Sequence, residues 1–161
     1  MTATRFFRQL AAAAVLLTTA CGGGSPTGSD GPTYAAIADT YVGTIGGVSQ
    51  GYLADLDFTL TIAQSGGSLS GTYALDGTLF DGVDTYAVAG TGTITGSIQS
   101  GNNPSVNLTI RTSACPNYTA QFSGTYDTAN QRLTIIGPME FFNEGTCTVG
   151  LSIPTTLVMT R

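Results

Sequence analysis

A serine within a glycine-rich pattern is the first feature of this 161-residue chain that could do chemistry. Residues 47–51 read Gly-Val-Ser-Gln-Gly and match the GxSxG pattern of hydrolases, in which the serine is the nucleophile. That reaction needs a general base, usually histidine, and a turn from a strand into a helix. Because the chain contains neither histidine nor lysine, we interpret residues 47–51 as a hairpin turn.

Three aspartates in a glycine-rich stretch could supply oxygen ligands to Ca²⁺. They are Asp76, Asp81 and Asp84, and we predict that residues 76–84 form a loop. Their spacing does not follow the EF-hand pattern, and an acidic loop in contact with solvent accounts for the same residues. The solvated loop is the favoured interpretation, and we expect neither a metal nor a cofactor.

Two acidic pairs, Asp55 with Asp57 and Glu140 with Glu144, are the remaining candidates for catalysis. Two carboxyl groups held at a fixed separation can cleave a glycosidic bond. Acidic pairs are also common at the ends of hairpins, and nothing in the sequence fixes the distance within either pair. We therefore predict a protein without enzymatic activity.

The elements that position these residues are predicted from the alternation of apolar and polar side chains. In the stretch Leu56–Gly77, Phe58, Leu60 and Ile62 alternate with polar or small residues, and apolar residues resume at the same spacing after Gly66-Gly67. Successive side chains of a strand point to opposite faces, so the stretch is typical of two half-buried strands. The glycine pair suits the tight turn between them.

The same alternation recurs and predicts eight strands between Asp39 and Arg161. Besides the Leu56–Gly77 hairpin, we expect strands at Asp39–Gly47, Thr85–Gln99, Ser105–Thr112, Tyr118–Asp127, Gln131–Phe142 and Cys147–Arg161, with a bulge at Gly137-Pro138 and an interruption at Pro154. Short connections favour an all-β, eight-stranded up-and-down antiparallel barrel, whose closure protects the strand edges. A two-sheet β-sandwich is the alternative.

Two short runs, Gly43-Thr44 and Ser70-Gly71-Thr72-Tyr73, resemble the lipocalin and avidin class of small β-barrels. The resemblance implies the architecture alone, since the chain has no tryptophan to match those of avidin's biotin site. Five aromatic residues could line a ligand cavity in such a barrel or fill its core: Tyr73, Tyr86, Tyr118, Phe122 and Tyr126.

The interior is either open or filled, and glycines bear on the choice. Gly90, Gly92 and Gly96 are expected to share the inner face of one strand with Val88 and Ile94. Glycines remove side-chain volume, so larger residues must enter that space or leave it hollow. Because protein interiors are generally close-packed, we expect a filled barrel.

The N-terminus predicts an export signal followed by a tether. Residues 1–20 carry Arg5 and Arg8 before an apolar run, and the segment ends at Ala20-Cys21. This ending resembles the lipobox of bacterial lipoproteins, although threonine stands at position 18 where leucine is usual. The resemblance implies a lipidated Cys21, a membrane partner, and a place in the cell envelope, at the outer membrane or cell surface. Residues 21–33 then form a flexible linker and residues 34–161 the barrel domain.

Without the first 20 residues, three arginines and ten acidic residues remain, which gives a net charge of −7. A chain this acidic is a poor partner for nucleic acid. An exported protein has its cysteines in an oxidising compartment, so Cys115 and Cys147 are expected to form a disulfide. In a meander both lie at the end opposite the termini, where we place a binding mouth. We therefore expect a non-catalytic structural or interaction protein, or a binding module for a small apolar or sugar-like ligand.

Overall fold

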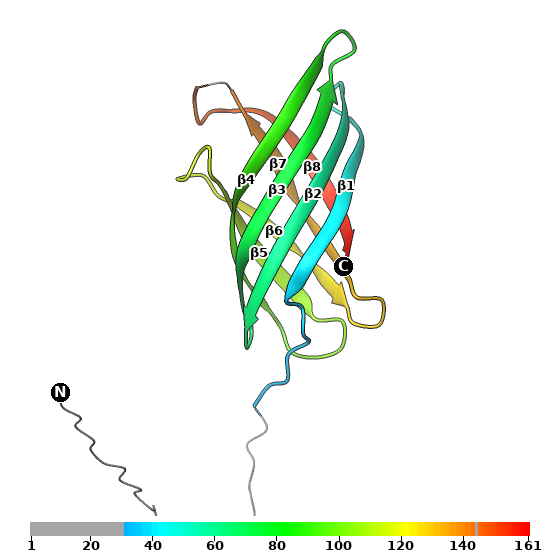
Figure 1. Cartoon of the computed structure of the whole chain (residues 1–161), viewed down its shortest axis with the longest axis vertical. Helices are drawn as coiled ribbons and strands as arrows, with labels where there is room; N and C mark the ends of the chain where they lie inside the picture. Colours follow the sequence, from blue (N-terminus) through cyan, green and yellow to red (C-terminus); the bar gives the residue numbers. More distant parts are fainter. Residues whose placement is uncertain (1–30, 144) are drawn as a thin grey trace, which may run out of the picture. The chain divides into compact units, whose positions relative to one another are not determined.

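The chain folds into a closed antiparallel β-barrel, seen in a computed structural model that describes residues 31–161 except residue 144 (Figure 1). The strands follow one another around the barrel in chain order, which confirms the predicted up-and-down topology and excludes the sandwich. They are β1 (Asp39–Ser49), β2 (Tyr52–Ser65), β3 (Ser68–Phe80), β4 (Thr85–Ile98), β5 (Ser105–Thr112), β6 (Ala120–Asp127), β7 (Arg132–Phe142) and β8 (Val149–Thr160). No described helix is long and apolar enough to cross a membrane.

The β2–β3 hairpin shows how the sequence pattern becomes the barrel wall. Phe58, Leu60 and Ile62 are buried, while Thr61 between them is exposed and Thr59 is half-buried. Gly66 has a φ of 58° in the two-residue turn, a conformation that glycine adopts without steric penalty. Inward-facing residues of every strand join one continuous apolar core.

Two predicted boundaries are wrong because the strand ladder extends or stops where the local composition does not indicate it. β3 continues to Phe80, so the predicted loop over residues 76–84 shrinks to residues 81–84. Pairing with β2 on one side and β4 on the other keeps this segment extended despite Asp76 and Gly77. Tyr118, predicted to begin a strand, lies in the β5–β6 loop.

We predicted a bulge at Gly137-Pro138 and an interruption at Pro154, and both predictions are wrong. Pro138 and Pro154 face each other in a regular part of the β7–β8 ladder, and the irregularity falls between Phe141 and Phe142 instead. β6 pairs with β7 only as far as Ile136, and β1 pairs with β8 only at Val42 and Thr160. Each proline therefore has a side without a strand partner, where a missing N–H is tolerated.

One end of the barrel, which we call the base, is closed by the segment that enters β1 and by the last residue of the chain. Ile37 is fully buried, and its backbone N–H donates to Oε1 of Gln64 at 2.8 Å. Arg161 donates from Nη2 to the Tyr126 hydroxyl at 2.9 Å and pairs with Asp39 at 3.2 Å. Tyr126 in turn packs edge-on against Tyr41, with ring centroids 6.3 Å apart. The base is thus filled and plugged.

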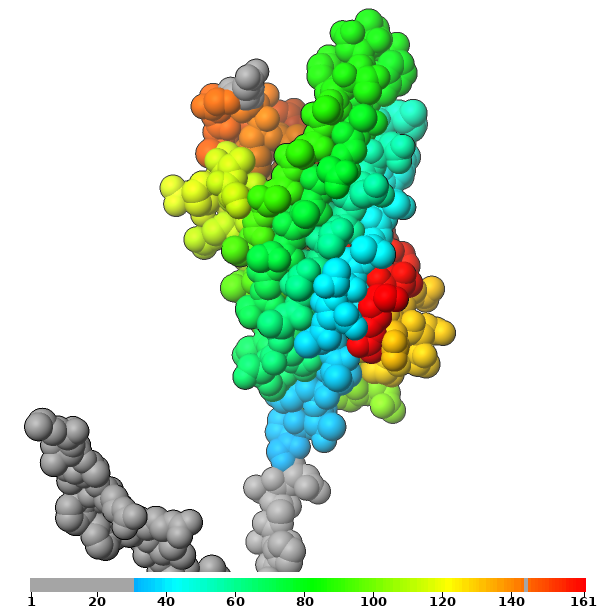
Figure 2. Space-filling model, in the orientation of Figure 1, coloured from blue at the N-terminus to red at the C-terminus, as the bar shows by residue number. Residues whose placement is uncertain are grey.

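The opposite end, which we call the mouth, carries the β1–β2, β3–β4, β5–β6 and β7–β8 connections, as Figure 1 shows. Cys115 lies in the β5–β6 loop and Cys147 in the β7–β8 turn, so both cysteines are at this end as predicted. The β3–β4 hairpin stands clear of the β7–β8 turn here, which Figure 2 shows as a notch in the surface.

Candidate binding groove at the mouth

The barrel wall is incomplete on one side of the mouth. β4 pairs with β3 from Thr85 onward, but its pairing with β5 begins only at Gly92. Across the gap, the part of β7 beyond Ile136 has no partner in β6. A groove of about 600 Å³ lies between these two strand segments, which we call the mouth groove. Ligand sites in proteins usually have volumes of 300–1,000 Å³, so the groove is large enough for a ligand.

Apolar side chains form the walls of the mouth groove, and Leu75, Leu79 and Val88 line its β3–β4 side. Met139 and Phe141 line the β7 side, and the backbone of the β5–β6 loop crosses between the two. None of the described residues that line the groove is basic.

Glu140 is the single acidic residue among those lining residues. Its Oε2 atom is buried and accepts no hydrogen bond from the described part of the protein. A buried polar atom without a partner destabilises a fold by about 1–3 kcal/mol. Glu140 therefore carries a hydrogen-bond acceptor that the described residues leave unused.

The edge of β4 that faces the groove offers further hydrogen-bonding groups. The N–H of Ile98 donates to Gly67 in the β2–β3 turn, whereas Ser113 donates to the carbonyl of Thr91 on the opposite side. Even-numbered residues of β4 thus bond toward β3 and odd-numbered residues toward β5. It follows that the N–H and C=O groups of Ala87 and Ala89 point toward the groove, where no described strand pairs with them.

Three of the five predicted aromatic residues meet beneath the mouth groove: Tyr73, Tyr118 and Phe122. Tyr73 stacks on Phe58 at 5.6 Å, and Tyr118 packs edge-on against Phe142 at 5.0 Å. The pocket among them has a volume of only about 30 Å³, far below the 300–1,000 Å³ of a usual ligand site. These aromatic residues form a packed floor under the groove.

The other two predicted aromatic residues lie elsewhere. Tyr126 is buried in the base beside Tyr41. Tyr86 is 46% exposed at the mouth, where its hydroxyl donates to Oδ2 of Asp81 at 2.9 Å. The five aromatic residues therefore do not line one cavity, because alternation along a strand gives the face of a side chain but not its height in the barrel.

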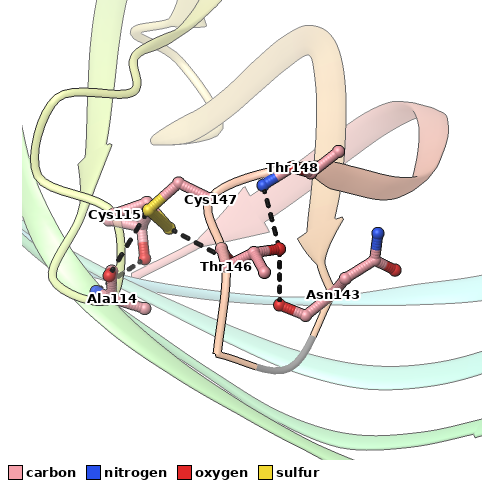
Figure 3. Close-up of a disulfide and its surroundings, with 7 residues drawn as sticks. Ala114, Cys115, Asn143, Thr146, Cys147 and Thr148 are labelled. Atoms are coloured by element: carbon pink, nitrogen blue, oxygen red, sulfur yellow. Dashed lines mark hydrogen bonds between the residues drawn. A yellow bond between two sulfur atoms is a disulfide. The ribbon is translucent and has the colours of Figure 1, made fainter.

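The disulfide between Cys115 and Cys147 ties the two loops on the β7 side of the mouth, with Cα atoms 5.5 Å apart (Figure 3). Cys115 is buried and Cys147 is exposed, so only half of the bridge is shielded from solvent. The β7–β8 turn is further fixed by a hydrogen bond from the Asn143 N–H to the Thr148 carbonyl at 3.0 Å. The loop that crosses the groove is thus held in place.

The three aspartates that were weighed as a Ca²⁺ site do not share one loop. Asp76 lies in β3 opposite Asp57 on β2, while Asp81 caps the β3–β4 turn. Hydrogen bonds from the backbone of Asp84 and Val83 and from the Tyr86 hydroxyl hold the pKa of Asp81 below its ordinary value. Among the described residues no group of three or more histidine, cysteine or acidic side chains could hold a metal ion.

The two motifs considered for catalysis also have structural explanations where they are described. Residues 47–49 end β1, and Gln50 and Gly51 form the turn into β2 with left-handed φ angles of 52° and 86°. Asp55 and Asp57 are exposed on the outer face of β2. Glu144, the proposed partner of Glu140, lies outside the described residues, and so does Cys21.

Comparison of this chain with protein-family models, with curated proteins and with solved structures finds no significant match. What can be said of its class therefore rests on the fold: it is a small, closed, eight-stranded up-and-down β-barrel.

Proposed function

We propose that this protein is a lipid-anchored component of the bacterial cell envelope, at the outer membrane or cell surface, that acts by binding a partner at the mouth groove and not by catalysis. The observation that carries the proposal is the position of the groove. It opens at the end opposite the one where the linker enters the barrel. A lipid on Cys21 would leave that end free to meet another molecule.

Exposed apolar side chains at the mouth support this role. Of the nine large hydrophobic residues that are exposed in the described part of the chain, six lie at this end: Val48, Leu53, Phe80, Val83, Tyr86 and Val149. Val48, Leu53 and Phe80 are direct neighbours across three strands. Contiguous apolar surface of this kind commonly marks an interaction site.

A binding module for a small apolar or sugar-like ligand is the second candidate function. The volume of the mouth groove favours it, since a small molecule of ordinary size would fit there. The pocket among the aromatic residues does not, because about 30 Å³ is far below the volume of a usual ligand site. Either function therefore depends on the groove, and the barrel interior proper is packed.

The anchor is tested by mass spectrometry of the mature protein. We expect a chain that begins at Cys21 and carries acyl chains there. A free N-terminal cysteine, or cleavage at another residue, would reject the lipid anchor.

The binding role is tested in living cells with a photo-reactive benzoylphenylalanine placed at Val88, whose side chain lines the groove. Thr95, exposed on the outer face of the paired half of the same strand, is the matched control position. We expect a discrete cross-linked species from Val88 and none from Thr95. Equal cross-linking at both positions, or none at either, would contradict the proposed role.

A further inference from the structure

We propose that the mouth groove binds an extended peptide segment of a partner protein, which adds a strand to the free edge of β4 and places a basic side chain at Glu140. This inference rests on the proposed binding function and names its partner by chemistry. The peptide would pair with Ala87 and Ala89 in the way that added strands pair with sheet edges in other peptide-binding domains.

The edge of β4 lacks the features that normally prevent such pairing. Proteins protect exposed edges with lysine, proline, bulges or a covering loop. Thr85–Gly90 contains no charged residue and no proline, and its ladder with β3 is regular. Its groove-facing N–H and C=O groups therefore form an open template for an extended chain.

Charge complementarity selects the side chain that the peptide carries. Among the described residues, Glu140 is the one charged residue that lines the groove, and its Oε2 accepts no hydrogen bond from them. An arginine or lysine on the bound segment would provide that donor and neutralise the carboxylate. A second copy of this chain fits less well, because residues 31–161 contain only three basic against nine acidic residues and two copies would repel.

The test uses the soluble chain from residue 22 onward, a segment that includes the whole described domain, and the probe peptide acetyl-SVTVRVTVS-amide. Amide hydrogen exchange of Ala87 and Ala89 is measured by NMR with and without the peptide at millimolar concentration, with Thr93 on the paired half of β4 as internal reference. Control peptides carry N-methyl groups at alternate residues, in either register, or glutamate in place of the arginine.

We expect the arginine peptide to slow exchange at Ala87 and Ala89 at least tenfold and to leave Thr93 unchanged. N-methylation in the register that faces β4 should abolish the effect. The glutamate peptide should bind about tenfold more weakly, and Glu140→Gln should remove that difference between the two peptides.

Four results would overturn the proposal. The first is no slowing of exchange, and the second is slowing that survives N-methylation in both registers. The third is slowing that depends on the protein concentration alone. The fourth is tighter binding of octyl glucoside than of the peptide. The third would assign the edge to a second copy of the chain and the fourth would assign the groove to a small amphiphile. Cross-linking from Val88 in cells together with any of these outcomes would leave the binding function standing and reject only the peptide.

Discussion

The base and the mouth of this barrel are built from the same strands but differ in how completely those strands are paired. At the base, β4 has a partner on both sides from Gly92 onward, and aromatic side chains fill the interior. At the mouth, the first half of the same strand is paired on one side only, and a groove takes the place of the missing neighbour. The second half of β4 therefore closes the barrel, while its first half leaves an open edge for a partner.

The largest effect is expected from removing the disulfide, because the mouth has less packing to replace it. Cys115 and Cys147 are 32 residues apart in sequence, and releasing a loop of that length should destabilise the fold by about 3–4 kcal/mol. Urea denaturation of the double variant Cys115→Ser/Cys147→Ser, compared with the wild type, measures this loss. A change below about 1 kcal/mol would show that packing alone holds the two loops.

Two glycines on β4, two residues apart, lie on either side of the boundary between base and mouth. A Cβ atom on Gly92 would overlap the carbonyl oxygen of Arg111 and approach the Tyr73 ring to 2.6 Å, whereas a Cβ on Gly90 would meet nothing within 4 Å. We therefore expect Gly92→Leu to destabilise the protein by about 1–3 kcal/mol through overpacking. Gly90→Leu should leave the denaturation midpoint nearly unchanged and fill the groove. Equal midpoints for the two variants would contradict the boundary.

A smaller effect should appear in alkaline solution and should come from the base. Burial, with a contribution from the neighbouring Tyr126, raises the pKa of Tyr41 above its ordinary value of 10. The unfolded chain then ionises Tyr41 at a lower pH than the folded chain does. The stability that depends on neutral Tyr41 is complete below pH 10 and is lost as the pH rises through the folded-state pKa.

Thermal denaturation between pH 9 and pH 11.5 tests this dependence. Tyr41→Phe should flatten the alkaline decline more than Tyr86→Phe does, because Tyr86 is exposed at the mouth. A larger change from Tyr86→Phe would mean that Tyr86 at the mouth, and not Tyr41 at the base, dominates the alkaline loss of stability.

Much of the fold could be predicted from the sequence because alternation at a spacing of two is a local signal. β5 was predicted with its observed bounds, and the inward positions of β2 are those of the alternating apolar residues. The extension of β3 beyond Gly77 to Phe80 could not be predicted, since pairing with β2 and β4 overrides local composition there. The plug formed by Ile37 and Gln64 depends on a hydrogen bond across 27 residues, which no local pattern encodes.

For the candidate site, the sequence predicted only the end of the barrel at which it lies. The disulfide and the turns indicated the mouth, but the spacing of the aromatic residues left open whether they line a cavity or fill the core, and it did not show that Tyr86 and Tyr126 lie apart from the others. A usable signal for the free edge was present: β4 has 14 residues and its neighbour β5 only 8, so part of β4 must lack a partner. From the sequence, Glu140 was considered as half of a catalytic pair. Only the structure shows that its Oε2 accepts no hydrogen bond from the described residues.

Native-state amide hydrogen exchange of the unliganded protein can compare base and mouth within β4, because it reports on single amides of both halves of the strand. Thr93 and Thr95 lie opposite Arg111 and Thr109 in the β4–β5 ladder, whereas Ala87 and Ala89 face the groove. Exchange at Ala87 and Ala89 should be at least about a hundredfold faster than at Thr93 and Thr95. Equal protection at all four positions would mean that the wall is closed at the mouth, and would contradict the account.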